Sequence, residues 1–314
     1  MKEQEKRINV YIITGFLGAG KTTLLNHLLK QFQLSRNVVI ENEFGKINID
    51  ATLVNENYES VFELTNGCIC CSINNQLLET LNNISSLPNK PDNIFIETTG
   101  IADAGEIAAN FTPLYMHPIF SLKKIITVID AENFFSYRES NAVITKQIVA
   151  ADCILINKET DENSILIEVI KKEVQSMNPF AKIHLSTDGF LDWAYLKTKN
   201  ADKVIHSNGP QNIEVGHKIK TVLYETDDLF DIQKLKYELF RHLFLYYHQI
   251  YRIKGYVLDE SKQVFLVQTV GKTVTISPKN KIIIGKSQLV FIGKEITDNT
   301  IKRIVKGTNI KLAS

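Results

Sequence analysis

A glycine-rich segment at residues 15–22, GFLGAGKT, constrains this chain more than any other feature. It fits the pattern G-x-x-x-x-G-K-[ST] at every fixed position. A β-rich run at residues 9–14 precedes it, and leucines recur at helical spacing over residues 21–31 behind it. A strand, a glycine-rich loop and a helix in this order let backbone N–H groups surround phosphate groups. Because the pattern and its flanks are both present, a chance glycine turn is the weaker interpretation.

The same segment predicts a nucleotide site that uses Mg²⁺. Lys21 is expected to reach the β and γ phosphate oxygens as a catalytic group, and the Thr22 hydroxyl is expected to bind Mg²⁺. The predicted nucleotide contacts of the loop are Gly15, Gly18, Ala19, Gly20, Lys21, Thr22 and Thr23.

Apolar β-type runs alternate with helix-like segments along the first 200 residues. We expect strands at 38–40, 93–96, 125–129, 153–156 and 182–185, and helices at 73–81 and 164–174. This alternation predicts an α/β fold, in which a mostly parallel sheet of the P-loop NTPase type is flanked by helices.

The pattern changes after a polar stretch at residues 197–216. Beyond it, strands are expected at 219–224, 250–258, 264–269, 274–276 and 289–292, and helices at 232–246 and 300–305. We therefore predict a nucleotide-binding domain at 1–200, a linker at 201–217, and a smaller α+β domain with an antiparallel sheet at 218–314.

Composition describes an ordinary globular chain. Hydrophobic residues make up 44% and charged residues 23%, and the formal net charge is +1. This balance gives no general attraction to nucleic acid or to an anionic membrane. Residues 1–8 contain no apolar signal core, and no stretch approaches the roughly 18 apolar residues that span a bilayer. We expect a cytoplasmic protein without nucleic-acid or membrane partners.

Three of the four cysteines stand together as Cys68, Cys70 and Cys71. In a reducing cytosol such a cluster favours metal ligation over a disulfide framework, although a redox pair or buried thiols are alternatives. Three thiolates leave the fourth tetrahedral position of a soft metal open, as in a site that exchanges ligands. They suit Zn²⁺ and do not exclude Co²⁺. Cys153 lies inside an apolar run and is interpreted as a core residue.

Acidic residues end two of the predicted strands. Glu97 follows an apolar run at the edge where ligands of open α/β sheets bind, and it is expected to hold Mg²⁺ through water or to position the attacking water. Its alternative is a solvated strand-end acid. Gly100 is expected to let its amide approach the γ-phosphate. For Asp130, a cap or turn role is at least as well supported as chemistry.

Five motifs occur in a specific order along the first domain. They are GFLGAGKTT at 15–23, ENEFG at 41–45, GCICCS at 67–72, ETTG at 97–100, and Asn157-Lys158. Together they resemble the CobW family of metallochaperone GTPases. The resemblance extends to the second domain, where RIKG at 252–255 and LVFIG at 289–293 are similar to family motifs.

The resemblance implies a SIMIBI-type P-loop GTPase that binds zinc or cobalt through the three cysteines and couples nucleotide state to metal delivery into a client metalloprotein. It also implies that Asp50 is the switch I acid and that Glu41 and Glu43 face the metal or Mg²⁺, although acids in this segment also fit ordinary surface charge. Lys46 stands where many relatives carry a glutamate, which puts a second metal site in doubt. A nucleotide- or metal-dependent dimer is a further expectation.

Base recognition departs from the family pattern. Asn157 and Lys158 match the start of the guanine-reading motif N-K-x-D, but Thr160 occupies the place of its aspartate and Asp161 comes one residue late. Losing a buried charged hydrogen bond costs about 1.5 to 3 kcal/mol, or one to two decades of preference for GTP. Either the loop shifts so that Asp161 reaches the base, or ATP competes. GTP is favoured on the resemblance, and residues 186–189 form either the other wall of the base pocket or a turn.

Two functions of different classes fit these residues. The first is a GTPase that hydrolyses GTP to GDP and delivers zinc or cobalt. The second is a nucleotide-dependent sensor or scaffold with a structural zinc and little turnover, and an ATP-using relative is a narrower alternative.

Overall fold

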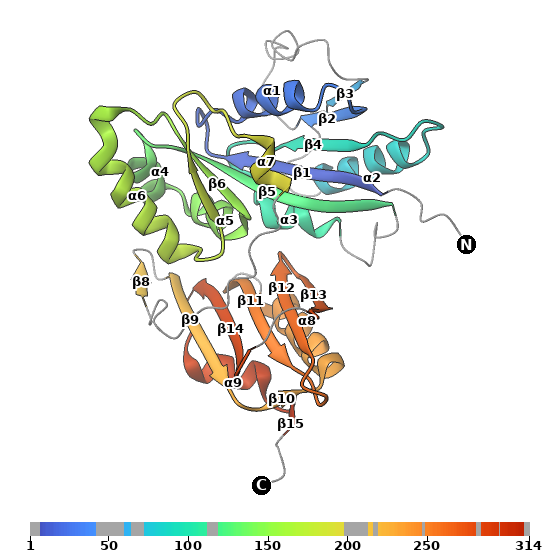
Figure 1. Cartoon of the computed structure of the whole chain (residues 1–314), viewed down its shortest axis with the longest axis vertical. Coiled ribbons are helices and arrows are strands. Elements are labelled where there is room, and N and C mark those ends of the chain that lie inside the picture. Colours follow the sequence, from blue (N-terminus) through green and yellow to red (C-terminus); the bar gives the residue numbers. More distant parts are fainter. Residues whose placement is uncertain are drawn as a thin grey trace. The chain divides into compact units, whose positions relative to one another are not determined.

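The computed structural model describes residues 7–41, 60–63, 72–111, 119–197, 213–215, 219–246, 249–280, 284–294 and 296–310. The chain divides into two compact units. The first comprises residues 1–171 and 181–200, and the second comprises residues 172–180 and 201–314. Each unit has a sheet of its own (Figure 1).

The first unit is built on a parallel sheet with the strand order β3-β2-β4-β1-β5-β6-β7. Its strands are β1 (Ile8–Gly15), β2 (Asn37–Glu41), β3 (Ser60–Glu63), β4 (Asn93–Glu97), β5 (Phe120–Asp130), β6 (Cys153–Asn157) and β7 (Lys182–Leu185). Its helical segments are α1 (Lys21–Gln31), α2 (Ser72–Ser85), α3 (Ala104–Ala109), α4 (Phe134–Ser140), α5 (Ala142–Ala150), the 3₁₀ turn η1 (Asp161–Asn163) and α7 (Trp193–Lys197). The helix α6 (Ser164–Met177) begins in the first unit, and its residues 172–177 belong to the second. The predicted α/β fold is confirmed.

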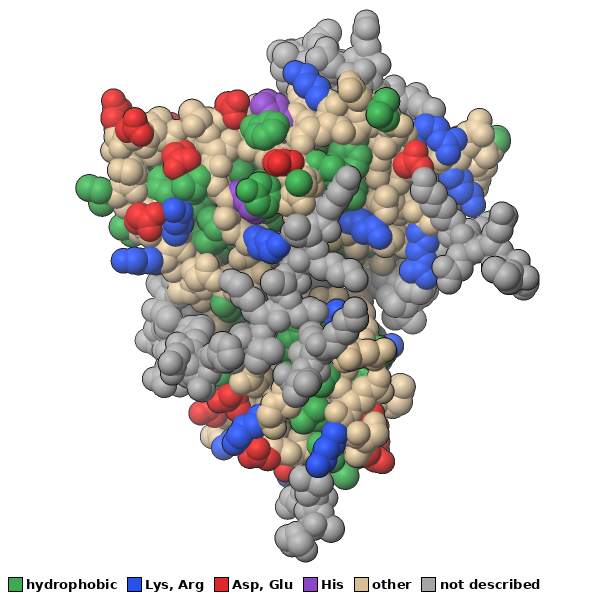
Figure 2. Space-filling model, in the orientation of Figure 1, with side chains coloured by type: hydrophobic (Ala, Val, Ile, Leu, Met, Phe, Trp, Pro, Cys, Tyr) green, Lys and Arg blue, Asp and Glu red, His purple; other side chains and the backbone are tan. Residues whose placement is uncertain are grey.

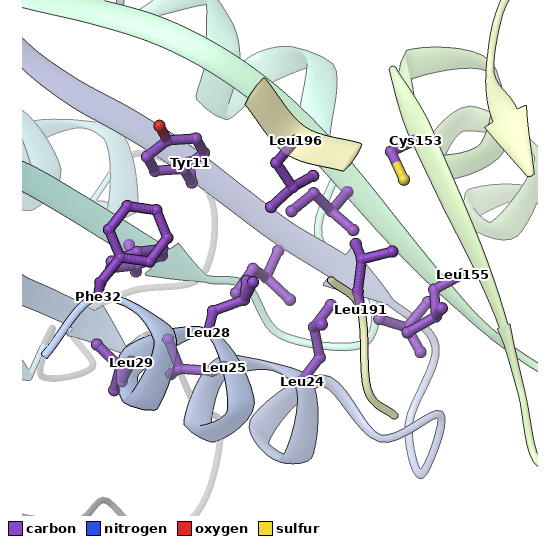
Figure 3. Close-up of a cluster of buried hydrophobic side chains, with 14 of the residues drawn as sticks. Tyr11, Leu24, Leu25, Leu28, Leu29, Phe32, Cys153, Leu155, Leu191 and Leu196 are labelled. Carbon is purple, nitrogen blue, oxygen red and sulfur yellow. The ribbon is translucent and has the colours of Figure 1, made fainter. Parts of the chain in front are cut away.

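Helices cover this sheet on both faces, which explains why its strands are continuously apolar. On one face, leucines of α1 pack with Tyr11, Phe32 and Leu155 in the core drawn in Figure 3. Alternate residues of β1 point the other way, and Val10 and Ile12 are also fully buried. The short helices α3 and α5 contact each other, β1 and β5.

Cys153 lies in the core beside Leu155 and is 4% exposed (Figure 3). Burial raises the pKa of its thiol to about 12, so the group stays protonated and inert. The interpretation of Cys153 as a core residue is confirmed. Trp193 packs edge-on against Phe32, with ring centroids 3.9 Å apart, which gives it a structural role.

The second unit contains an antiparallel sheet with the order β13-β12-β11-β14-β9-β8. Its strands are β8 (Ile213–Val215), β9 (Ile219–Thr226), β11 (Ile250–Leu258), β12 (Val264–Val270), β13 (Thr273–Pro278) and β14 (Ser287–Lys294). A separate pair joins β10 (Leu229–Phe230) to β15 (Asn309–Ile310). The helices are α8 (Ile232–Tyr246) and α9 (Asp298–Val305). Leu235, Leu239 and Leu243 of α8 are fully buried against the sheet core.

The second unit matches the predicted α+β arrangement. The strand β8 was not predicted, because residues 213–215 lie in the polar stretch 197–216. This short segment becomes a strand by pairing with β9, with Ile213 opposite Thr221. Acidic and basic side chains both occur across the face of the molecule drawn in Figure 2, in line with the small net charge.

The carboxyl ends of β4, β1, β5 and β6 meet at one edge of the parallel sheet. After β1 the chain forms β2, β3 and β4 on one side of β1, and it then crosses to form β5, β6 and β7 on the other side. The strand order therefore reverses at β1. Ligands of open α/β sheets bind at such a point. The residues that end these strands are Gly15, Glu97, Asp130 and Asn157.

Candidate nucleotide-binding site

Two glycines of the loop between β1 and α1 are required by close neighbours. Gly15 has φ 142°, and a Cβ there would collide with the carbonyl oxygen of Val128 on β5. Gly20 has φ 100°, and a Cβ there would lie 2.5 Å from the Nδ2 atom of Asn157. Left-handed backbone favours glycine; at Gly15 the backbone contact excludes any side chain, and at Gly20 a side chain would displace the Asn157 amide. The loop therefore lies directly against β5 and the end of β6.

Lys21 begins α1 and is 9% exposed. Its Nζ atom donates to the carbonyl oxygen of Phe16 at 3.3 Å. The ammonium group is thus held over the loop that precedes the helix, which is the position from which a lysine reaches bound phosphates.

Thr22 and Glu97 are brought together from α1 and β4. The Thr22 hydroxyl donates to Oε1 of Glu97 at 2.7 Å, and Glu97 is 5% exposed. Glu41 ends β2 in register with Glu97 and is partly buried. A hydroxyl and a carboxylate are hard oxygen ligands of the kind that Mg²⁺ prefers. The residues therefore fit a magnesium site at this edge.

The segment after Glu97 is hydrogen-bonded to the end of β1, the strand that precedes the phosphate-binding loop. The backbone N–H of Thr98 donates to Ile13 at 3.0 Å, and its hydroxyl donates to Thr14 at 2.9 Å. Gly100 lies so close to the loop that a Cβ would be 2.6 Å from the nitrogen of Leu17. The predicted Gly100 therefore sits against the phosphate-binding loop.

Asn157 braces the same loop from β6. Its Nδ2 atom donates to the carbonyl oxygen of Ala19 at 2.9 Å. The Oδ1 atom is buried and has no hydrogen-bond partner among the residues that the structure describes. The side chain is thus fixed by the loop through one end only.

Lys158 adopts a left-handed backbone with φ 63° and forms an ion pair with Asp130. Its Nζ atom lies 2.7 Å from Oδ2 of Asp130 at the end of β5. Asp130 also accepts from Asn133 Nδ2 at 2.9 Å and from the backbone N–H of Glu132 at 3.0 Å. Asp130 therefore combines the predicted turn role with a charged contact to Lys158.

The charges of this pair stabilise each other. Burial raises the pKa of Asp130, but the hydrogen bonds from Lys158 and Asn133 outweigh it and hold the pKa below its usual range. The hydrogen bond to Asp130 raises the pKa of Lys158. Both groups are ionised at neutral pH.

Thr160 is occupied by the local backbone. Its side chain accepts from the backbone N–H of Asn163 and caps η1, while Asn163 Oδ1 accepts from the N–H of Thr160 at 2.9 Å. Asn163 Nδ2 donates to the carbonyl oxygen of Lys158 at 2.8 Å. These hydrogen bonds close the loop at residues 158–163, and Asp161 begins η1 with an exposed side chain.

Residues 186–189 form a turn beside this loop. The N–H of Glu159 donates to the carbonyl oxygen of Ser186 at 3.0 Å. Gly189 has φ 78°, and a Cβ there would lie 3.2 Å from Cγ2 of Thr23. Oδ1 of Asp188 accepts from the Ser186 hydroxyl at 3.3 Å and from the N–H of Phe190 at 3.1 Å. The turn thus touches both sides of the site.

The other predicted residues lie outside the described part of the chain. They are Glu43, Asp50, Cys68, Cys70 and Cys71. The described part resumes at Ser72, the first residue of α2. Among the described residues, no group of three or more His, Cys, Asp or Glu side chains could hold a metal ion. Within the same residues, no helix is long and apolar enough to cross a bilayer.

Two known protein families match the two parts of this chain. The CobW/HypB/UreG nucleotide-binding domain matches residues 9–185, and the cobalamin synthesis protein cobW C-terminal domain matches residues 219–308. The chain belongs to the CobW/HypB/UreG family. The resemblance read from the five motifs is therefore confirmed, and residues 15–22 belong to a nucleotide-binding domain of this family.

Relatives extend over nearly the whole chain. The zinc chaperone YjiA of Escherichia coli (strain K12) is 29% identical over 317 residues, which cover 96% of this chain and 98% of that protein. Zinc-regulated GTPase metalloprotein activator 1 of Schizosaccharomyces pombe is 35% identical over 193 residues, or 59% of this chain and 47% of that protein. The crystal structure of zinc(II)-bound YjiA GTPase has a TM-score of 0.69 at 23% identity and covers 96% of this chain and 99% of that one. This structural match establishes the shared fold.

Two contacts around the site were not predicted from the sequence. The ion pair of Lys158 with Asp130 was not predicted, although the strand-end position of Asp130 is a signal for it. Gln147 of α5 contacts the segment after Glu97 and was not predicted at all. No local pattern marks it, since it lies 47 residues from its partner Gly100.

Proposed function

We propose that this protein is a Mg²⁺-dependent GTPase that binds zinc through Cys68, Cys70 and Cys71 and transfers it to a client metalloprotein. The contact of Thr22 with Glu97 carries the nucleotide half of the proposal. It places an oxygen donor of the phosphate-binding helix 2.7 Å from a buried strand-end carboxylate. In this proposal, residues 1–200 form the nucleotide domain, 201–217 connect it, and 218–314 form the second domain of a cytoplasmic protein.

The residues at this edge would hold a Mg²⁺ ion, which would supply positive charge against the charge that develops during hydrolysis. Thr22 would hold it directly, and Glu97 would hold it through water or orient the attacking water. Lys21 would contact the phosphates, and Gly100 would offer its amide to the γ-phosphate. Asp50 completes the proposed catalytic set, with Glu41 and Glu43 assigned to the metal side.

Replacing Glu97 tests this arrangement. Glu97→Gln keeps the size of the side chain and removes its charge, so turnover at saturating GTP and Mg²⁺ should fall by about 10²-fold. Glu106→Gln in α3, an exposed acid away from the strand edge, is the matched control and should keep wild-type turnover. Equal turnover of both variants would contradict the assignment of Glu97.

Guanine selection is proposed to use Asp161. Thr160 is engaged in the cap of η1, and Asp161 carries the exposed carboxylate that follows in this loop. A carboxylate can accept two parallel hydrogen bonds from guanine, which a hydroxyl cannot. An ATP-using protein is the competing reading. Measuring the GTP and ATP affinities of the wild type and of Thr160→Asp distinguishes the two alternatives. Asp also caps helices, so this variant should preserve the turn.

Zinc delivery rests on the thiol cluster and on the relatives. Three thiolates favour Zn²⁺ and tolerate Co²⁺, and they keep one coordination position open for transfer. Relatives of nearly full length are named zinc chaperones. The Cys71 position immediately precedes α2 in the nucleotide-binding domain. Nucleotide state can drive transfer only if it changes zinc affinity. A dimer dependent on nucleotide or metal belongs to the same proposal.

Zinc titration in two nucleotide states tests the coupling. We expect zinc affinities with GDP and with a non-hydrolysable GTP analogue to differ by at least about tenfold, because a smaller difference shifts the bound population little. Cys153→Ala is the control and should retain the zinc stoichiometry, since Cys153 is a core residue. Equal zinc affinities in both states would support the second function, a sensor with a structural zinc.

A further inference from the structure

Gln147 on α5 is a fully buried polar residue that the proposed mechanism does not use. Its Nε2 atom donates to the carbonyl oxygens of Gly100 and Ala102, both at 3.1 Å. Two carbonyl oxygens can face only the amide NH₂ group, which fixes the orientation of the side chain. Both amide hydrogens are therefore used to hold the segment that follows Glu97.

Neighbouring contacts anchor Gln147 to the rest of the unit. The backbone carbonyl oxygen of Gln147 accepts from the hydroxyl of Thr127 on β5 at 2.8 Å. The preceding residue, Lys146, forms an ion pair with Asp103 at 2.9 Å. Asp103 in turn caps α3 by accepting from the N–H of Gly105 at 2.9 Å. Two consecutive residues of α5 thus hold the segment 100–103 at both of its ends.

The opposite side of this segment touches the phosphate-binding loop. Gly100 lies against Leu17, where a Cβ would be 2.6 Å from the backbone nitrogen. The segment therefore lies between the loop and α5, and its position depends on both. Gln147 Oε1 is buried without a hydrogen-bond partner in the described chain, so the contribution of the side chain comes from its donor group.

We propose that Gln147 is a positioning residue of the nucleotide site. By holding the carbonyl oxygens of Gly100 and Ala102, it keeps the Gly100 amide and Glu97 where the γ-phosphate and its Mg²⁺ bind. Small displacements of positioned groups cost large factors in rate. This inference rests on the proposed GTPase function.

Gln147→Met tests the inference, because methionine fills similar space and donates no hydrogen bond. The control is Gln31→Met. Gln31 also donates to two carbonyl oxygens, those of His27 at 3.2 Å and Leu191 at 3.0 Å, but it lies at the far end of α1. Loss of two hydrogen bonds should lower the unfolding temperature of both variants, so stability alone does not separate them.

Two readouts separate positioning from stability. For Gln147→Met, we expect turnover at saturating GTP to fall about tenfold while GDP affinity stays within about twofold. We also expect the preference for a non-hydrolysable GTP analogue over GDP, measured with Mg²⁺, to fall about tenfold. Gln31→Met should keep both wild-type values.

Failure of this inference can be distinguished from failure of the proposed GTPase function. Absence of GTP turnover by the wild type would refute the GTPase proposal, and the analogue-to-GDP ratio would still measure the position of Gly100. Wild-type turnover and an unchanged ratio in Gln147→Met would overturn the inference. Equal losses in Gln147→Met and Gln31→Met would also overturn it.

Discussion

Asp130 shows how one residue can serve two parts of a site. Its carboxylate caps the turn that leads into α4 and pairs with Lys158 at 2.7 Å. From the sequence, a turn role was at least as well supported as a chemical one. The structure adds the ion pair because β5 and β6 are neighbours in register, with Asp130 opposite Asn157.

The depressed pKa of Asp130 predicts an effect of acid. A carboxyl whose pKa is lower in the folded state stabilises the fold above its ordinary range, near pH 4, and loses that contribution as the pH falls through the folded-state pKa. The free energy of unfolding of the wild type should therefore decrease from pH 5 to pH 3, and less so in Asp130→Asn. Chemical denaturation at each pH measures this. Parallel pH curves for the two proteins would contradict the prediction.

Asp161 gives a prediction on base selection. If its carboxylate pairs with guanine, Asp161→Asn should weaken GTP binding by about ten- to 100-fold. The amide should instead favour xanthosine triphosphate, whose donor and acceptor pattern is complementary to it. Competition binding with both nucleotides measures the exchange. Glu159→Gln in the same loop is the control, and retained GTP preference in Asp161→Asn would assign the base to another group.

At the scale of elements, strongly patterned segments were predicted and weakly patterned ones were not. The residues of α1 and β6 form single uninterrupted runs, and both elements appear where the sequence places them. In α5, β-branched residues such as Ile144 and Val149 obscure the helix, because they favour strands by local preference. Packing of α5 against α3 and the sheet decides its conformation.

The phosphate-binding loop predicts different costs for two glycines. Gly20→Ala combines a left-handed backbone with a collision with Asn157, so it should lower nucleotide affinity and break the contact of Asn157 with Ala19. Gly18→Ala meets nothing within 4 Å and should cost only the backbone strain of φ 74°, about 1 kcal/mol. Calorimetric GDP titration and thermal unfolding compare the two. A larger loss of affinity in Gly18→Ala would contradict this account of the loop.

At the scale of the whole molecule, the family assignment joins a nucleotide site to a thiol cluster. The cluster precedes α2 in the sequence of a domain that already has a continuous hydrophobic core. Such a domain has little need of a metal for folding, in contrast to small zinc domains that unfold without it.

Replacing all three clustered cysteines tests that distinction. The triple Ser variant of Cys68, Cys70 and Cys71 should stay folded, with a thermal unfolding midpoint within a few degrees of the metal-free wild type, and it should lose any effect of zinc on GTP turnover. Circular dichroism and a turnover assay with added zinc are the measurements. Unfolding of the variant would assign the zinc a structural role.

The sequence by itself determined the features that depend on residues close together in the chain. The glycine pattern, the strand that precedes it and the ordered motifs predicted the parallel sheet, the nucleotide site and the family. Tertiary structure alone decided which distant residues support that site. Gln147 reaches Gly100, and Asp130 reaches Lys158. The reason is physical: hydrogen bonds and ion pairs form between groups that the fold brings within about 3 Å, and local sequence patterns do not specify those distances.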